Sequence, residues 1–172
     1  MQHALWGSIG LPIGSWLHVR KCDVEKLSAE SKWTPQTQLV QAAELVLRAS
    51  RRVRAAGRQV WVVADGAYAK RPFVRPLMAD GITVVGRLRK DAALHDVPPV
   101  VQKPGPGRPR TYGINEISLA KRAAHPQGWS EVTCSVNGQE VIKPVKTFLA
   151  THETFGGTIR MVISKEDHGP QF

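Results

Sequence analysis

The carboxylate of Asp65 occupies the position in this sequence that is best suited to chemistry. It follows residues 59–64, a short apolar run that fits a β-strand buried on both faces, and it precedes Gly66. Ligand-binding and catalytic groups of open α/β sheets gather at the carboxyl ends of the strands. A carboxylate there, beside a glycine that lets a phosphate backbone approach, is suited to holding a divalent cation. Taken alone, the Asp-Gly dipeptide is more typical of an ordinary turn.

The segments around Asp65 predict a βαβ unit. An amphipathic helix capped by Thr34 and closed by Gly57 comes before the Asp65 strand. Residues 69–79 predict a short helix, and residues 82–85 predict the next strand. Because the links are short, we expect the two strands to be parallel, with a right-handed crossover.

The C-terminal part predicts antiparallel β structure. Two runs, 131–136 and 141–151, flank Asn137 and Gly138, a dipeptide that is a strong signal for a β-hairpin. A third strand is expected at 158–164. The region is therefore of a different kind from the βαβ unit.

Apolar residues are frequent near the N-terminus as well. Residues 4–22 predict two short strands around a Gly/Pro turn, and this core-like start suggests a missing upstream partner. The five tryptophans are interpreted as core residues rather than as base-stacking platforms; they are Trp6, Trp16, Trp33, Trp61 and Trp129.

The charge balance favours polyanionic partners. The 172 residues contain 24 Lys and Arg against 14 Asp and Glu, a formal net charge of +10. Each phosphate that a Lys or Arg neutralises releases condensed counterions, so this surplus promotes nucleic-acid binding. Basic proteins of other kinds have similar compositions, and charge alone does not decide between the two.

The composition disfavours several classes of protein. Cys22 and Cys134 lie far apart in the sequence, which predicts reduced thiols rather than a disulfide framework. The six histidines include no pair at metal-ligand spacing, so a zinc site is not expected. Neither a signal peptide nor an apolar run of about 20 residues is evident, so we expect a cytoplasmic protein without a membrane segment.

The wider context of Asp65 resembles a known family. Residues 61–90 begin Trp-Val-Val-Ala-Asp-Gly-Ala-Tyr-Ala-Lys-Arg-Pro-Phe and end Gly-Ile-Thr-Val-Val-Gly-Arg-Leu-Arg-Lys. This pattern resembles DDE transposases of bacterial insertion sequences, in the insertion-sequence-four-like group with an RNase H-like core. In that family the second metal-binding Asp follows a buried strand and opens an Asp-Gly-x-Tyr segment, which Asp65, Gly66 and Tyr68 match. Arg-Leu-Arg-Lys-Asp-Ala at 87–92 and Gly-Arg-Pro-Arg-x-Tyr-Gly at 107–113 also look like family features.

The resemblance implies an α/β fold: an incomplete RNase H-like core, with a mixed sheet and helices, plus an inserted antiparallel β segment. We expect a partial catalytic core at 1–92, a Pro/Gly-rich basic loop at 93–113, and a β-rich insertion at 114–172. The implied activity is metal-dependent DNA cleavage and strand transfer. Asp65 is then a catalytic residue and a ligand of Mg²⁺ or Mn²⁺, in a full-length protein that acts as an oligomer.

The other two carboxylates of the family's triad have no matching residues here. Between Asp23 and the Asp65 strand lies only one helix, not the two strands and helix that the family requires. Glu166 and Asp167 come too early, in a polar turn before Gly169, and the chain stops where another strand should continue. Two-metal cleavage uses ions about 3.5–4 Å apart, which one carboxylate cannot hold. We therefore expect a fragment that is inactive alone.

DNA contacts are expected from two basic segments. The first directly follows the strand at 82–85, and the second, at 103–110, has a Gly-Arg-Pro core that resembles an AT-hook. We favour a loop that contacts phosphates non-specifically; readout of a narrow A·T minor groove, and a solvated proline-rich loop without DNA contact, are the alternatives. The residues expected to contact DNA are Arg87, Arg89, Lys90, Lys103, Arg108 and Arg110.

Two other functions remain open at this point. One is a basic DNA-binding module with no catalytic ancestry, and the other is a relic reading frame that does not fold stably. The position of Asp65 favours the transposase, because a pure DNA-binding module has no need of a carboxylate that repels phosphates there.

Overall fold

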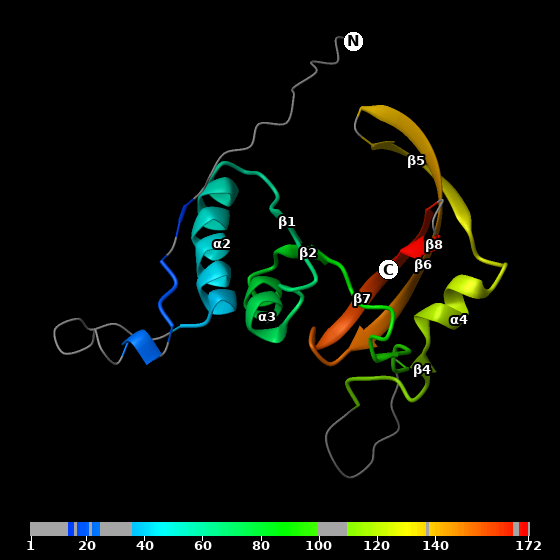
Figure 1. Cartoon of the computed structure of the whole chain (residues 1–172), viewed down its shortest axis with the longest axis horizontal. Helices are drawn as coiled ribbons and strands as arrows, with labels where there is room; N and C mark the ends of the chain where they lie inside the picture. Colours follow the sequence, from blue (N-terminus) through cyan, green and yellow to red (C-terminus); the bar gives the residue numbers. More distant parts are fainter. Residues whose placement is uncertain are drawn as a thin grey trace. The chain divides into compact units, whose positions relative to one another are not determined.

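The computed structural model describes residues 14–15, 17–20, 22–24, 36–99, 110–136, 138–166 and 169–171. The chain divides into two compact units, Met1–Val60 and Trp61–Phe172 (Figure 1). Cys22 and Cys134 are both free thiols. Within the described part of the chain, no helix is both long and apolar enough to span a bilayer.

The first unit contains the predicted amphipathic helix, α2 (Gln38–Ala55). The positive φ of Gly57 (69°) turns the chain so that the N–H of Arg58 donates to the Val53 carbonyl at 3.2 Å, so glycine closes the helix as predicted. The predicted cap was wrong. Thr37 caps the helix, with its hydroxyl accepting a hydrogen bond from the N–H of Val40 at 3.4 Å, while Thr34 lies outside the described residues.

The N-terminal strands are less well tested, because most of residues 4–22 lie outside the described ranges. The described residues 17–20 form no strand, and Leu17 is 70% exposed. For these residues the prediction of a core-like strand was wrong.

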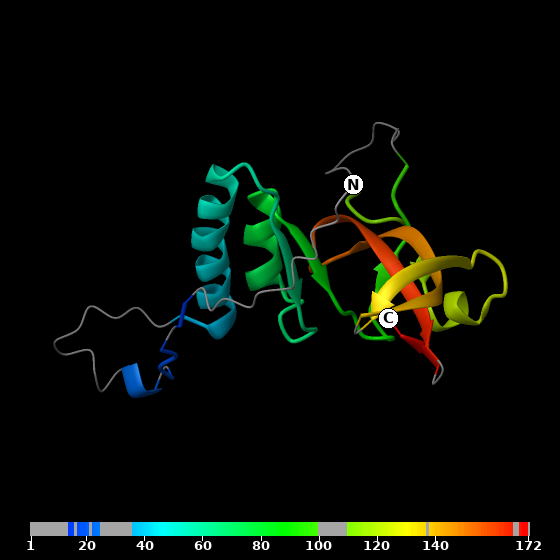
Figure 2. The same ribbon diagram turned by 90° about the horizontal axis from the view of Figure 1, so that it is seen from above.

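The second unit begins with the predicted βαβ unit. Strand β1 (Trp61–Ala64) is parallel to β2 (Thr83–Gly86), and helix α3 (Arg71–Ala79) connects them (Figure 2). The helix buries Phe73, Val74 and Leu77, whose spacing places them on one helical face. The predicted parallel arrangement is confirmed.

The prediction that the Asp65 strand is buried on both faces was wrong. Trp61 is 66% exposed and Val63 is 81% exposed, whereas Val62 and Ala64, which alternate with them, are half-buried. Within the described residues β1 pairs with β2 alone, so α3 shields one face of a two-stranded sheet. Trp61 is thus not a core residue, while Trp129 packs half-buried against the second sheet's core. Trp6, Trp16 and Trp33 lie outside the described residues.

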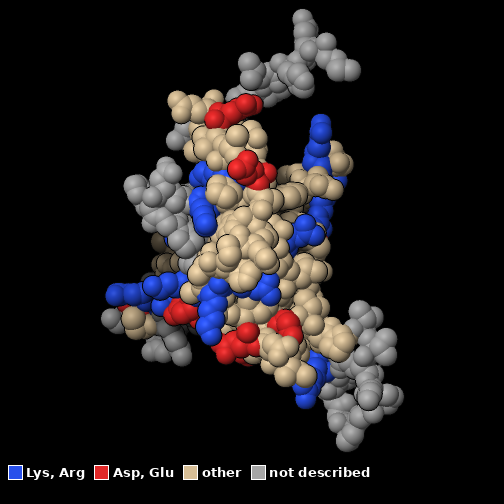
Figure 3. Space-filling model, turned by 90° about the vertical axis from the view of Figure 1, so that its right-hand side faces the viewer, with Lys and Arg blue, Asp and Glu red and all other residues tan. Residues whose placement is uncertain are grey.

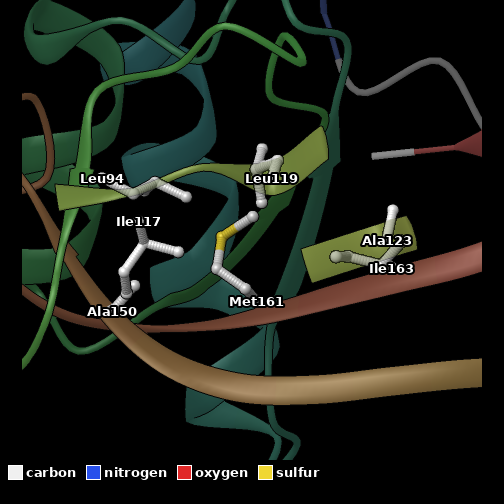
Figure 4. Close-up of a cluster of buried hydrophobic side chains, with 7 residues drawn as sticks. All are labelled: Leu94, Ile117, Leu119, Ala123, Ala150, Met161 and Ile163. Atoms are coloured by element: carbon white, nitrogen blue, oxygen red, sulfur yellow. The ribbon is translucent and has the colours of Figure 1, made fainter. Parts of the chain in front are cut away.

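The second sheet is antiparallel and six-stranded. Its strand order is β4-β3-β6-β7-β8, with β5 pairing with β6, and a short helix, α4, follows β4. The bounds are β3 Leu94–His95, β4 Glu116–Ile117, α4 Leu119–Ala124, β5 Ser130–Val136, β6 Gln139–His152, β7 Gly157–Glu166 and β8 Gly169–Gln171. The buried core is formed by Leu94, Ile117, Leu119, Ala123, Ala150, Met161 and Ile163 (Figure 4).

The antiparallel prediction for the C-terminal part is confirmed. Strands β5 and β6 form a long hairpin in which Val136 pairs with Gln139 across a two-residue turn. Gly138 in this turn has a φ of 82°, the conformation that the Asn-Gly signal predicts. Strand β7 covers and extends the third predicted strand.

Two elements of this sheet were not predicted. Strand β3 lies in the range 93–113, which we expected to be a loop, yet Leu94 is fully buried. A two-residue strand is too short to show an alternating pattern, so its pairing with β4 and β6 depends on residues distant in sequence. Helix α4 spans six residues and is capped by the Ser118 hydroxyl.

Arg75 connects the βαβ unit to the second sheet. From α3 its guanidinium donates to the carbonyls of Glu153 at 2.9 Å and Thr154 at 3.1 Å, in the turn between β6 and β7. Gly156 in the same turn has a φ of 73°, and a Cβ there would lie 3.1 Å from the guanidinium. The helix that follows Asp65 is therefore tied to the antiparallel sheet.

Gly113 is expected to tolerate no side chain. An added Cβ would lie 2.3 Å from the Asp96 carbonyl oxygen, which accepts the Gly113 N–H at 3.0 Å. We expect Gly113→Ala to lower the free energy of unfolding by about 1–3 kcal/mol or more, as overpacking does. Urea denaturation measures this. Gly157→Ala is the control, because no atom lies within 4 Å of its added Cβ; equal destabilisation of the two variants would contradict the prediction.

Stability is also expected to depend on His152. Its Nδ1 accepts the N–H of Thr154 at 3.1 Å, and burial, together with His95, lowers the pKa of His152 below its usual 6.5, while Glu153 raises it. The unfolded chain therefore binds the proton more readily, so this stability is present above about pH 6.5 and is lost as the pH falls. His152→Asn keeps an acceptor but does not titrate. Thermal unfolding at about pH 7 and about pH 5 should show a smaller loss for this variant than for the wild type; equal losses would exclude His152 as the source.

Candidate active site

Asp65 directly follows β1, and Arg87 directly follows β2. Ala64 pairs with Gly86, the last residue of each strand, so both chains leave the parallel sheet at the same edge. This places residues 65 and 87 in adjacent connections beyond that edge, where open α/β sheets hold ligands. The Asp65 side chain is exposed.

A tight turn fixes the backbone after Asp65. The Asp65 carbonyl accepts the N–H of Tyr68 at 2.8 Å, and the Tyr68 ring packs edge-on against Phe73 of α3, with 5.3 Å between centroids. A Cβ on Gly66 would lie 3.1 Å from the Arg87 carbonyl oxygen. The glycine thus serves the close approach of two chain segments, and the Asp-Gly-x-Tyr pattern has a structural reason.

The segment after β2 alternates between the core and the solvent. Leu88 is half-buried and packs against the core of the second sheet, while Arg87 and Arg89 on either side are exposed. Anchoring of Leu88 therefore directs both arginines away from the core.

These two segments line one cavity of about 680 Å³. It brings together Asp65, the expected metal ligand, with Arg87, Arg89 and Lys90, which we expect to contact DNA; these roles stay predictions. It also contains two charged residues that the sequence reasoning missed, Lys70 and Asp91. Lys70 is the N-cap residue of α3, five residues after Asp65, and Asp91 directly follows Lys90. Their closeness in sequence to the predicted residues could have indicated them.

The other predicted DNA-contacting residues are not part of this cavity. Lys103 and Arg108 lie outside the described residues. Arg110 is described and exposed, and it does not line the cavity.

Arg89 and Asp91 form a two-point ion pair within the cavity. Arg89 Nε lies 3.1 Å from Asp91 Oδ1, and Arg89 Nη2 lies 3.1 Å from Oδ2. The side chains are 86% and 62% exposed, so the pair is solvated and contributes little to stability. A phosphate offers the same pair of oxygens to a guanidinium, so it competes with Asp91 for Arg89.

The donor set fits one divalent cation and not a pair. Asp65 and Asp91 are the carboxylates among the cavity's lining residues, and Asp91 is already paired with Arg89. No group of three His, Cys, Asp or Glu side chains suited to a metal occurs within the described part of the chain. Mg²⁺ is commonly bound through one or two carboxylates, with substrate phosphates and waters completing the shell. Asp65 can supply one such ligand.

Comparison with known proteins identifies the family. A family model described as DDE superfamily endonuclease matches residues 11–154. The chain therefore belongs to the DDE superfamily endonucleases, and its mixed α/β architecture is consistent with an RNase H-like DDE nuclease fold. This membership implies DNA as the substrate class, and nucleases of this superfamily generally use divalent metal ions. Neither a curated protein nor a solved structure gave a significant match.

Asp91→Asn is expected to strengthen DNA binding. A phosphate that binds Arg89 must displace the Asp91 carboxylate, and the freed carboxylate then takes up a cation from solution. Removing the Asp91 carboxylate should therefore raise the affinity for DNA several-fold. It should also steepen the slope of log K against log salt by about one unit. Fluorescence anisotropy with a duplex at several salt concentrations measures both quantities.

Asp23→Asn is the matched control. It also removes one negative charge from an arginine pair (Arg20 Nε to Asp23 Oδ2, 2.7 Å), at a distance in sequence from the cavity segments. Weaker binding by Asp91→Asn, or the same gain in both variants, would show that Asp91 does not compete for Arg89.

Proposed function

We propose that this chain contributes Asp65 and its basic surroundings to the DNA-cleavage and strand-transfer site of a transposase of the insertion-sequence-four-like group. The observation that carries the proposal is the placement of Asp65 in one cavity with four cationic side chains, in a member of the DDE superfamily endonucleases. These cations are Lys70, Arg87, Arg89 and Lys90. A carboxylate among groups that can bind phosphate weakens DNA binding by repulsion unless it holds a cation.

Asp65 is the residue that would hold Mg²⁺ or Mn²⁺ in this site. The bound ion supplies charge neutralisation at the phosphodiester and activation of the attacking oxygen. The chain's own residues bind and orient the DNA: Arg87 and Arg89 offer planar guanidinium forks to phosphate oxygens, while Lys70 and Lys90 add point charges. Fixed positive groups around a phosphate also stabilise the additional negative charge of its transition state.

We propose further that this chain is inactive by itself. In-line cleavage with two ions needs more carboxylates than the single unpaired one in this cavity. The other ligands would come from residues outside the described ranges or from another polypeptide of an oligomeric transposase. Purified chain with Mg²⁺ or Mn²⁺ should therefore leave supercoiled plasmid uncut.

A basic DNA-binding module without catalytic ancestry is the second candidate. The surplus of cationic side chains in the cavity favours it, because four cations accompany two carboxylates. The two functions differ in whether Asp65 binds a metal ion.

Site-directed cleavage by Fe²⁺ tests this point in the chain as it is. Bound Fe²⁺ with ascorbate and peroxide produces radicals that cut the polypeptide near the ion. In the presence of duplex DNA, we expect cuts close to Asp65 and in the segment 87–91 that lines the same cavity. Excess Mg²⁺ should suppress these cuts, and gel analysis with end-labelled chain locates them.

Asp65→Asn should abolish this cutting while DNA binding remains nearly unchanged, because the amide is a poor ligand for a hard cation. Asp23→Asn serves as the control and should be cut like the wild type. Unchanged cuts in Asp65→Asn would remove Asp65 as a metal ligand and leave the DNA-binding module as the better description.

A further inference from the structure

A second cationic cluster lies on the antiparallel sheet. The indole ring of Trp129 has two ammonium groups close to it, Lys146 Nζ at 4.7 Å and Lys165 Nζ at 4.6 Å from the ring centroid. A third cation, the guanidinium of Arg122 on α4, lies 4.3 Å from the centroid of the Phe148 ring. None of these residues lines the Asp65 cavity.

The central cation of this cluster is held rigidly. Lys146 is 6% exposed, and its ammonium donates to the carbonyls of Arg122 and His125 at 2.8 Å each. Trp129 is fixed to the same segment, because its indole N–H donates to the His125 carbonyl at 3.1 Å. Burial, and then the charges of Lys165 and Arg122, lower the pKa of Lys146. The Lys146 side chain thus satisfies carbonyls at the C-terminal end of α4 and places its ammonium group beneath the surface.

The outer cations have no ion pair with an acidic residue among the described side chains. Arg122 and Lys165 are both exposed, and the ion pairs of the described residues include neither of them. Within this part of the chain, three like charges are therefore gathered around two aromatic rings. Aromatic faces stabilise single cations, but they do not remove the repulsion between neighbouring ones. An external anion would relieve that repulsion.

We propose that Arg122, Lys146 and Lys165, organised by Trp129 and Phe148, form a second docking surface for the phosphate backbone of duplex DNA. The identity of the polyanion as DNA rests on the proposed function. Both outer cations are exposed, which suits a backbone lying along a surface. Figure 3 shows Lys and Arg side chains interspersed with Asp and Glu on one face of the molecule.

The arrangement favours contact with phosphates over stacking of bases. The Trp129 ring already has two ammonium groups of its own chain next to it, so it is not a free platform for a nucleobase. Cations that are already held on aromatic rings lose less freedom when they bind phosphates. We therefore expect binding that is salt-dependent and insensitive to base sequence.

The test compares cations on the two faces of one strand. In β7, Met161 and Ile163 are buried while Arg160 and Val162 are exposed, so Lys165 lies on the face of Ile163 and Arg160 lies on the opposite face. Lys165→Gln and the matched control Arg160→Gln each remove one positive charge. Arg122→Gln and the double variant with Lys165→Gln complete the set. Anisotropy titrations of the full chain with duplex DNA over a range of salt concentrations give affinity and slope.

Lys165→Gln and Arg122→Gln should each flatten the slope of log K against log salt by about 0.9, the double variant by roughly twice that, and Arg160→Gln by much less. Lys165→Arg should restore the wild-type slope, which separates loss of charge from loss of fold, and thermal unfolding checks each variant. The proposal would be overturned by any of three results: the double variant keeps the wild-type slope, Arg160→Gln flattens the slope equally, or the wild type does not bind DNA. So would variants that weaken binding to phosphatidylserine vesicles and leave DNA binding unchanged.

Failure of this second surface can be distinguished from failure of the proposed function. The Fe²⁺ experiment reports on Asp65 and does not involve the β7 face. Arg87→Gln, in the cavity, should flatten the slope independently of Lys165→Gln, and the two changes should add, because the two sites share no residue. An unchanged slope in Lys165→Gln, together with the expected flattening in Arg87→Gln, would reject the second surface alone.

Discussion

The site depends on the register between two parallel strands. Ala64 pairs with Gly86, so the chain leaves β1 and β2 at the same edge and Asp65 comes next to Arg87. A slip of one residue would turn all side chains of one strand to the opposite face. Helix α3 opposes such a slip, because Phe73, Val74 and Leu77 are buried in its packing on the sheet. The close approach of Gly66 to the Arg87 carbonyl fixes the same register beyond the strand ends.

The antiparallel sheet supports the cavity from two directions. Leu88 lines the cavity and also packs against the sheet's core, so the positions of Arg87 and Arg89 depend on that core. Arg75 adds a second connection, from α3 to the carbonyls of the β6–β7 turn. Since α3 begins just after Asp65, both halves of the cavity are attached to one sheet. The antiparallel sheet thereby helps to set the spacing between Asp65 and the arginines.

The elements that sequence predicts well here have local causes. The βαβ unit and the Asn-Gly hairpin follow from short-range periodicity and turn chemistry. Asp65, Arg87, Arg89 and Lys90 stand after strand ends and line one cavity, while their roles stay predictions. Strand β3 was not predicted because two residues are too few to show an alternating pattern. The close contact of Gly113 with Asp96 was not predicted because the two residues come from different segments of the chain. The exposure of Trp61 was not predicted for a different reason. An apolar run shows that a strand can be buried, but whether it is depends on what packs against it.

The charges in the cavity determine an order of events in the proposed function. Four cationic side chains and two carboxylates leave it net positive, so a free divalent cation is repelled before DNA is present. Each bound phosphodiester lowers this positive charge by one and brings oxygen ligands of its own. In the proposed function, these oxygens and Asp65 would form a set that Mg²⁺ accepts, as it commonly does when substrate phosphates complete its shell. The substrate would then complete the metal site. By thermodynamic reciprocity, metal and DNA should each strengthen the other's binding, and this coupling passes through Asp65.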